Sequence, residues 1–100
     1  MNDKIYTQLQ IKEILAPVFR SHNVKRAVLF GSYAKGNAKK KSDIDIMVDS
    51  GLRGLAFFGL LEDVVTSLDK SVDLLDKSEI IPDSKVDNEI RESGVVIYGE

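Results

Sequence analysis

Apolar residues recur every three to four positions in the first part of the chain, which is the period of a helix. Over residues 3–19 the apolar positions are Ile11, Ile14, Leu15, Val18 and Phe19. This pattern predicts an amphipathic helix that ends near residues 21–23. Pro17 lies inside the pattern and lacks an amide proton, so we expect a kink or a new helix start near Ala16.

Shorter apolar segments predict three strands. Residues 24–30 are rich in strand-forming side chains, and residues 27–30 are apolar at every position, as in a strand covered on both faces. Residues 43–48 and residues 72–75 predict two further strands. One helical turn over residues 33–36, with Ser32 as its N-cap, is expected directly after the first strand.

The helix between the second and third strands is expected to be largely buried. It runs from Leu55 to about Asp69, and its apolar stripe is wide. The stripe contains Leu55, Phe57, Phe58, Leu60, Leu61, Val64, Val65 and Leu68. A strand-helix-strand unit of this length should be a right-handed crossover between parallel neighbours. That geometry brings Asp73, on the third strand, beside Asp43 and Asp45 on the second.

The C-terminal part of the chain predicts a short helix and a last strand. Ser84 and Asp87 resemble a capping box for a helix that ends at Ser93, before Gly94. Residues 95–98 form an apolar strand, which at a sheet edge is free to pair with a second copy or with a partner. The whole pattern predicts one α/β domain over residues 1–100, with a mixed sheet of about four strands packed with helices.

The composition indicates the class of protein and its cellular location. The 100 residues are 43% hydrophobic and 30% charged, as in ordinary globular proteins. A net charge of -2 argues against a protein whose main function is to bind nucleic acid, because binding of phosphate backbones requires a basic surface. There is no cysteine, no apolar signal core after Met1, and no run near the ~18 residues of a membrane span. We therefore expect a cytoplasmic protein.

Two carboxylates share one face of the second strand. Side chains in a strand alternate between faces, so Asp43 and Asp45 point one way while Ile44 and Ile46 point the other. Like charges roughly 7 Å apart at their Cα atoms repel each other unless a cation lies between them. Mg²⁺ meets this need, because it binds oxygen ligands, uses one or two carboxylates and leaves positions for phosphate.

The turn at Gly31 and Ser32 supplies the complementary part of such a site. Glycine lets the backbone approach a ligand closely, and the amide groups and hydroxyl of the turn are suited to phosphate oxygens. The sequence therefore predicts a site for a metal ion and a nucleotide.

The stretch FGSYAKGNAKKKSDIDIMV, residues 30–48, resembles the signature of the DNA polymerase beta-like nucleotidyltransferase superfamily: Gly-Ser, ten residues, then Asp-x-Asp. It is most similar to the minimal nucleotidyltransferases (MNT proteins), which are often antitoxins of HEPN-domain ribonuclease toxins. The resemblance extends over nearly the whole chain, including ESGVVIY at residues 92–98. Lys35 stands where these proteins commonly have arginine, so a bidentate phosphate contact there would become a point-charge contact.

The resemblance implies a polymerase beta-like fold, a reaction and its residues. The implied catalytic and metal-binding residues are Asp43, Asp45 and Asp73, and those that hold the nucleotide are Gly31, Ser32, Lys35 and Ser42. The implied cofactors are two Mg²⁺ ions, with ATP as the donor. The implied reaction transfers AMP to a hydroxyl group of a partner HEPN toxin and so silences it.

Each assignment has an alternative. Acidic and apolar residues alternate in any half-solvated strand, so an Asp-x-Asp pair also fits an ordinary solvated face. The segment of Asp73 also contains Asp76, so it fits an ordinary strand with a polar face. The lysines at residues 39–41 form either a solvated loop or a contact with the triphosphate or an acidic partner. For function, one alternative is an antitoxin that occludes the toxin without catalysis. Another is transfer of a nucleotide to a small molecule, such as an aminoglycoside, at a site completed by a dimer.

Overall fold

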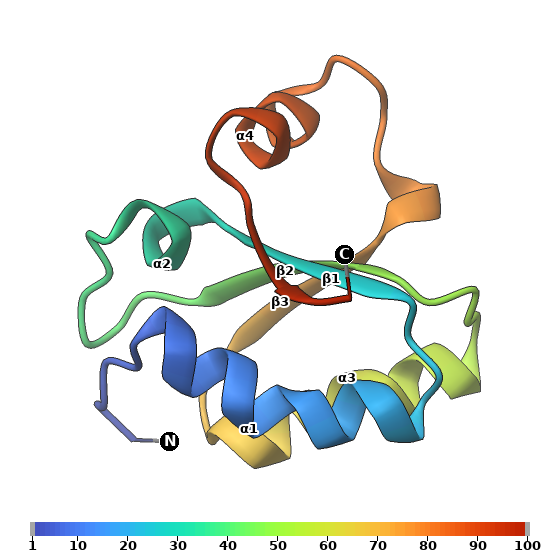
Figure 1. The fold of residues 1–100 in the computed structure, drawn as a ribbon, viewed down its shortest axis with the longest axis horizontal. Helices are drawn as coiled ribbons and strands as arrows, with labels where there is room; N and C mark the ends of the chain where they lie inside the picture. Colours follow the sequence, from blue (N-terminus) through green and yellow to red (C-terminus); the bar gives the residue numbers. More distant parts are fainter. Residues whose placement is uncertain (1, 100) are drawn as a thin grey trace.

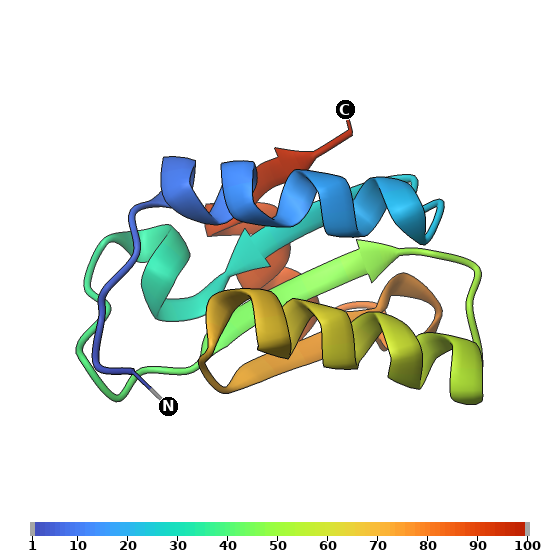
Figure 2. The ribbon, with the colours of Figure 1, turned by 90° about the horizontal axis from the view of Figure 1, so that it is seen from below.

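The computed structural model describes residues 2–99, which form a four-stranded mixed sheet with helices on both faces. The elements are α1 (Gln8–Ser21), β1 (Arg26–Phe30), α2 (Gly31–Lys35), β2 (Ile44–Asp49), α3 (Leu55–Leu68), β3 (Val72–Asp76), the 3₁₀ turn η1 (Lys77–Glu79), α4 (Lys85–Ser93) and β4 (Val95–Tyr98). Figure 1 shows α1 and α3 on one face of the sheet and α4 on the other, and Figure 2 shows α1 and α3 crossing the first face together. The predicted α/β fold with a mixed sheet is confirmed.

The strands lie in the order β3-β2-β1-β4. β1 is antiparallel to β2 and to β4, whereas β2 is parallel to β3, so β2, α3 and β3 form the predicted unit between parallel neighbours. Phe30 is opposite Asp45, and Asp45 is opposite Asp73. The end of β1 and the beginnings of β2 and β3 therefore meet at one end of the sheet. β4 is an edge strand, and its pairing with a second copy stays a prediction.

Side chains of β2 alternate between two cores. The larger core, between the sheet and helices α1 and α3, contains Ile44, Ile46 and Val48. Met47 belongs to the smaller core with Val28 and Phe30 of β1, against which Ile90 of α4 packs. Both faces of β1 are covered, which explains its continuous apolar run. Because residues two apart in a strand share a face, Asp45 lies on the face of Met47 and α4.

Helix α1 begins later than its periodicity predicts. It starts at Gln8 rather than near Asp3, because Thr7 and Gln10 form a capping box. The Gln10 N–H donates to Thr7 Oγ at 3.0 Å, and the Thr7 N–H donates to Gln10 Oε1 at 2.9 Å. These two bonds satisfy amide groups that a longer helix would have to pair elsewhere.

Pro17 does not divide α1, so the predicted new start near Ala16 is wrong. One helix continues through Pro17 to Ser21. The side chains of Leu15 and Phe19, on either side of the proline, are fully buried against the sheet. This packing holds the helix together, since most helical stability in proteins comes from the buried face rather than from local propensity.

Helix α2 starts at Gly31, so the predicted N-cap, Ser32, lies inside the helix instead. Gly31 has a φ of +70° and turns the chain into the helix directly after β1. Phe30 occupies the cap position in extended conformation and gives no side-chain hydrogen bond. The other strands and α4 begin and end within two residues of their predicted bounds, and Ser84 caps α4 by accepting the Asp87 N–H at 3.2 Å.

Helix α3 is less buried than its composition predicts. Leu55 is 88% exposed and Phe58 is 53% exposed, so the prediction of a largely buried helix is wrong at these two positions. The fully buried stripe is Leu60, Val64 and Leu68. Only the face toward the sheet and α1 is covered, because no further layer of the described chain lies beyond α3 (Figure 2). No helix within residues 2–99 has the length and apolar character needed to cross a membrane.

Candidate active site

The three predicted carboxylates lie where β1 ends and β2 and β3 begin. Asp45 is in register with Asp73 across the parallel strands, and Asp43 directly precedes β2. Asp43 follows the face of Asp45, since residues two apart in an extended chain point the same way. Asp45 is half-buried, whereas Asp43 and Asp73 are exposed. The structure thus brings all three residues together at one end of two neighbouring strands.

Gly31 lies directly against the Asp45 carboxylate. A methyl group at Gly31 would overlap Oδ2 of Asp45. The φ of +70° at Gly31 is also a left-handed conformation that costs other residues free energy. Both the close approach and the backbone conformation therefore require glycine at this position. As a result, the predicted phosphate-binding turn and the predicted metal-binding carboxylates share one site.

The charges in this site repel one another. The pKa of Asp45 is raised from 3.8 to about 6, first by burial and then by the negative charges of Asp73, Asp43 and Glu89. A cation placed among these carboxylates would be stabilised by the same charges. Shifts of this kind are concentrated at functional sites.

The carboxylates do not form a preassembled metal cage. Within the described part of the chain, no three His, Cys, Asp or Glu side chains are grouped closely enough to hold an ion by themselves. Mg²⁺ commonly binds one or two carboxylates and completes its shell with substrate phosphates and water. Asp43, Asp45 and Asp73 therefore fit a Mg²⁺ ion that enters with a triphosphate.

Lys35, the predicted phosphate ligand, has a partner within the protein. Its Nζ donates to Oε1 of Glu89 on α4 at 3.0 Å. Glu89 also raises the pKa of Asp45, so it is a fourth acidic group of the site. Glu89 is not among the site residues predicted from the sequence, because only the tertiary position of α4 brings it to the end of β1 and the beginning of β2. The half-buried position of Glu89 on α4 is visible only in the structure.

The two predicted nucleotide-binding serines differ in their surroundings. Ser32 is half-buried within α2. Ser42 closes the loop before β2: its Oγ accepts the Lys39 N–H at 2.8 Å, and its own N–H donates to the Lys39 carbonyl at 3.0 Å. Ser42 therefore shapes the approach to Asp43. Its contact with a nucleotide stays a prediction.

Asp76 is separate from this site. It lies at the opposite end of β3 from Asp73 and is only 5% exposed. Its carboxylate accepts hydrogen bonds from the hydroxyl groups of Ser50 and Ser78, each at 2.6 Å. Asp76 thus joins the loop after β2 to η1, while Asp73 is the β3 carboxylate beside Asp45.

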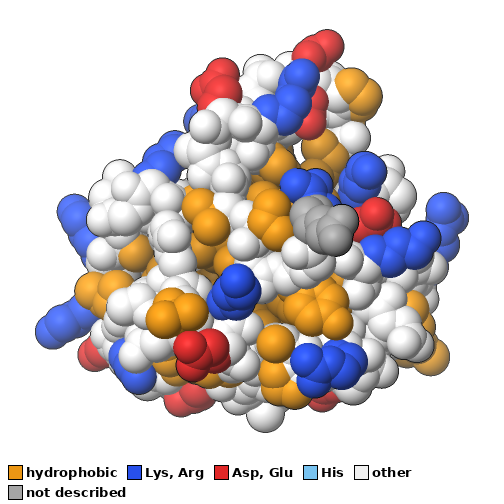
Figure 3. Space-filling model, viewed as in Figure 1, with side chains coloured by type: hydrophobic (Ala, Val, Ile, Leu, Met, Phe, Trp, Pro, Cys, Tyr) orange, Lys and Arg blue, Asp and Glu red, His pale blue; other side chains and the backbone are white. Residues whose placement is uncertain are grey.

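Basic side chains are scattered on the face shown in Figure 3, where they alternate with acidic and apolar ones. The net charge of the chain is -2. Extended contact with a phosphate backbone needs a gathered basic surface. The basic side chains on this face are not gathered into one continuous surface.

Residues 10–100 match the family model described as polymerase beta, nucleotidyltransferase. Two relatives from Methanocaldococcus jannaschii are similar in sequence. "Putative protein adenylyltransferase MJ0435" is 40% identical over 76 residues, which cover 73% of this chain and 81% of the relative. "Putative protein adenylyltransferase MJ1215" is 38% identical over 86 residues, which cover 80% of this chain and 100% of the relative.

Solved structures with this fold include toxin-antitoxin complexes. A chain in a crystal structure of a toxin-antitoxin with AMP-PNP has a TM-score of 0.74 and 28% identity, covering 89% of this chain and 73% of that one. A chain in the tri-AMPylated Shewanella oneidensis HEPN toxin in complex with MNT antitoxin has a TM-score of 0.69 and 25% identity, covering 94% of this chain and 74% of that one. The family match and these likenesses agree with the geometry of the site. The protein therefore belongs to the polymerase beta nucleotidyltransferase family and has the fold of chains found in MNT antitoxin and HEPN toxin complexes.

Proposed function

We propose that the protein transfers AMP from Mg-ATP to a hydroxyl group of a HEPN-domain toxin and thereby acts as its antitoxin. The observation that carries the proposal is the position of Asp45, in register with Asp73 and against Gly31. Transfer at phosphorus depends mainly on positioning and charge stabilisation, which carboxylate-bound metal and a tight glycine turn supply. The names of the Methanocaldococcus relatives support protein adenylylation as the reaction.

The donor nucleotide would lie along the Gly31 turn. Gly31 and Ser32 would hold the β- and γ-phosphates through backbone amides and the serine hydroxyl. Lys35 would exchange its bond to Glu89 for one to the triphosphate. Asp43, Asp45 and Asp73 would hold two Mg²⁺ ions, which neutralise the triphosphate and ease the departure of pyrophosphate.

The acceptor would approach from the side of Asp73, which is exposed to solvent. Its hydroxyl oxygen forms a bond to the α-phosphorus of ATP, the bond from that phosphorus to the bridging oxygen breaks, and pyrophosphate leaves. Asp73 would take up the proton that the hydroxyl loses. This carboxylate suits the role because it is accessible and adjacent to Asp45.

The remaining walls of the site would come from the toxin. Asp43 and Asp73 are both exposed, so the described chain leaves the acceptor side open. The complexes of MNT antitoxin with HEPN toxin support a HEPN protein as the chain that closes it. The tri-AMPylated state of one such toxin supports AMP as the transferred group and more than one transfer.

Binding without catalysis is the second candidate function. One observation favours it: Lys35, the predicted phosphate ligand, is already bonded to Glu89. In this account the protein silences the toxin by covering its surface, and the nucleotide site plays no part.

A double substitution separates the two functions. With the product of the adjacent reading frame as the toxin, we expect Asp43→Asn with Asp45→Asn to bind it but to leave its ribonuclease activity intact. Asp49→Asn, at the far end of β2, is the matched control and should inhibit as the unchanged protein does. Full inhibition by the double variant, or by the unchanged protein without ATP, would sink the enzymatic proposal and establish occlusion.

A further inference from the structure

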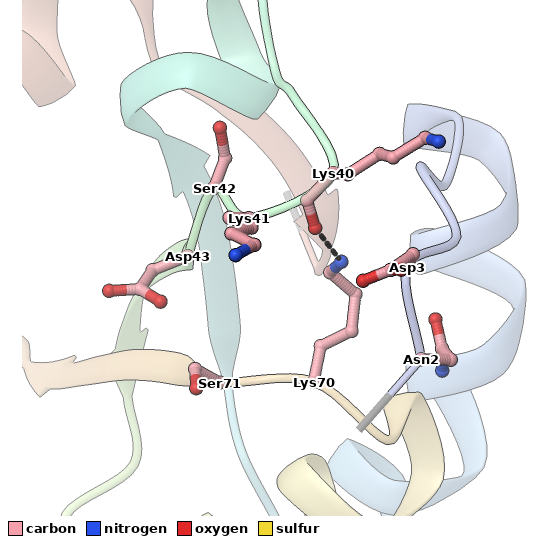
Figure 4. Close-up of a pocket in the computed structure, with 8 residues that line it drawn as sticks. All are labelled: Asn2, Asp3, Lys40, Lys41, Ser42, Asp43, Lys70 and Ser71. Atoms are coloured by element: carbon pink, nitrogen blue, oxygen red, sulfur yellow. Dashed lines mark hydrogen bonds between the residues drawn. The ribbon is translucent and has the colours of Figure 1, made fainter.

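A small cavity lined by lysines lies beside the carboxylates. Figure 4 shows it between the loop that leads into β2, Lys70 before β3, and the N-terminal residues Asn2 and Asp3. Its volume is about 190 Å³. In the strand order, β1 with the Gly31 turn flanks β2 on one side and β3 flanks it on the other. The cavity therefore lies on the side of β2 away from the predicted triphosphate turn.

Lys70 provides this cavity with a buried positive charge. The residue is only 3% exposed, and its Nζ donates to the Lys40 carbonyl at 2.9 Å, the dashed line in Figure 4. No carboxylate within residues 2–99 forms an ion pair with Lys70. A buried ammonium whose partner is a neutral carbonyl keeps much of its desolvation cost. An anion in the cavity would offset that cost.

The other charges around the cavity also favour an anion. Lys40, Lys41 and Lys70 line it together with Asp3 and Asp43, so three positive charges face two negative ones. Figure 4 shows the Asp43 carboxylate directed away from Lys70, the Asp3 carboxylate on the side of Lys70, and the Lys40 ammonium extended away from it. Lys41 and Lys70 therefore remain the candidate ligands. Lysine ammonium groups are common phosphate partners, as point charges.

The volume of the cavity limits the size of the anion that it can hold. Pockets that enclose drug-sized ligands measure roughly 300–1,000 Å³. At about 190 Å³ this cavity is smaller, so it suits a single phosphate group rather than a whole nucleotide. The nucleoside attached to such a phosphate would extend outward, past Asp43 toward the carboxylates.

We propose that Lys41 and Lys70 form a subsite for the phosphodiester of an AMP already attached to the acceptor, and that this subsite promotes the next transfer. The inference rests on the proposed function, which it extends to a second substrate, the AMP-bearing acceptor. A phosphodiester held in the cavity would present its ribose on the acceptor side, next to Asp73. The cavity thus gives the first product a position from which it becomes the second acceptor.

The second transfer repeats the chemistry of the first with a sugar hydroxyl. A ribose hydroxyl oxygen of the attached AMP forms a bond to the α-phosphorus of a new ATP. The bond between that phosphorus and the bridging oxygen breaks, pyrophosphate leaves with its electron pair, and the hydroxyl proton passes to Asp73. The phosphodiester in the cavity is unchanged by the step.

Substitutions of the cavity lysines test the subsite. The product of the adjacent reading frame is incubated with Mg-ATP and each variant, and the rates of the first and second AMP additions are read by intact-mass spectrometry. We expect Lys41→Gln and Lys70→Met each to lower the ratio of second to first addition about tenfold, the usual scale for losing one charged hydrogen bond. Lys39→Gln is the matched control, because Lys39 lies on the same exposed loop but does not line the cavity.

The outcomes separate the subsite from the proposed function. Absence of any AMP addition by the unchanged protein would overturn the proposed function. Addition that stops at one AMP, or variants that keep the ratio of the unchanged protein, would overturn the subsite alone. Lys41→Gln keeps the test decisive if Lys70→Met does not fold, since the Lys41 side chain is exposed.

A binding measurement tests the subsite without any reaction. Inorganic phosphate is titrated into the protein while amide NMR signals are followed. We expect shifts at Lys41, Ser42 and Ser71 that are lost in Lys70→Met. Shifts confined to Gly31 and Ser32 would assign phosphate to the donor turn and contradict the subsite.

Discussion

At the scale of single residues, the position of Asp45 in the candidate site lowers the stability of the folded state. Its carboxylate lies against Gly31 and near Asp73 and Glu89, and its pKa is raised to about 6. Groups arranged for function often reduce stability in this way. The raised pKa means that the folded state binds a proton at Asp45 more tightly than the unfolded state does. The ionised carboxylate therefore destabilises the fold above about pH 6, and this penalty fades as the pH falls toward 4.

Asp45→Asn should remove this penalty. In Mg²⁺-free buffer at pH 8 we expect the variant to be more stable than the unchanged protein by about 1 kcal/mol, a value reduced because solvent reaches the carboxylate and screens it. The gain should shrink through pH 6 and vanish near pH 4. Urea unfolding across this pH range measures it, with Asp49→Asn as the control on the same strand. A gain that stays constant with pH would show that ionisation of Asp45 is not its cause.

Gly31 and Gly36 form a matched pair for testing the contact with Asp45. Both have a positive φ, of 70° and 77°, but a methyl group at Gly36 would meet no atom, whereas one at Gly31 would overlap the Asp45 carboxylate. Gly36→Ala should cost about 1–2 kcal/mol of stability and keep nucleotide binding. Gly31→Ala should cost more and abolish binding of Mg-ATP. Calorimetric titration measures the binding, and equal affinity in the two variants would refute the role given to Gly31.

At the scale of elements, short stretches of sequence predicted where most helices and strands begin and end. Contacts between distant elements determined the features that the sequence did not predict. β2 and α4 follow from an apolar alternation and a serine cap, which a few neighbouring residues specify. The pairing of Asp45 with Asp73 follows from the strand-helix-strand unit. This part of the site was therefore predictable from the sequence. The exposure of Phe58 was not predictable from the sequence, because it depends on which other elements cover α3. The hydrogen bond between Lys35 and Glu89 was not predictable either, because it joins two helices that are far apart in the sequence.

The Asp76 network should anchor the loops at the end of the sheet opposite the active site. Burial raises the pKa of Asp76, but hydrogen bonds from Ser50 and Ser78 outweigh it and the net pKa is lowered from 3.8. The ionised group therefore stabilises the fold above about pH 4, and this contribution is lost as the pH falls through the lowered pKa. Asp76→Ala should cost about 1–3 kcal/mol at pH 7, because it removes the hydrogen bonds that Ser50 and Ser78 donate to a charged carboxylate.

Thermal unfolding at pH 7 measures the cost of Asp76→Ala, and Lys77→Ala, at the exposed neighbouring residue, is the control. AMP transfer by Asp76→Ala should be retained at a temperature where the variant is folded, since Asp76 is remote from Asp73 along β3. Loss of transfer without loss of stability would contradict a purely structural role for Asp76.

At the scale of the molecule, the proposed function assigns half of an active site to the sheet. The donor turn and the carboxylates lie at one end of the strands, and the side of Asp43 and Asp73 is open. The described chain is compact, with a radius of gyration of 12.5 Å. The account therefore depends on a partner that brings its hydroxyl group to Asp73.

Intact-mass spectrometry tests this account most directly. The protein is mixed with Mg-ATP and the product of the adjacent reading frame, and both chains are weighed. We expect the partner to gain one or more AMP groups, and to gain none when Asp43 and Asp45 are both replaced by asparagine. A tight complex in which neither chain gains AMP would contradict it and favour inhibition by occlusion.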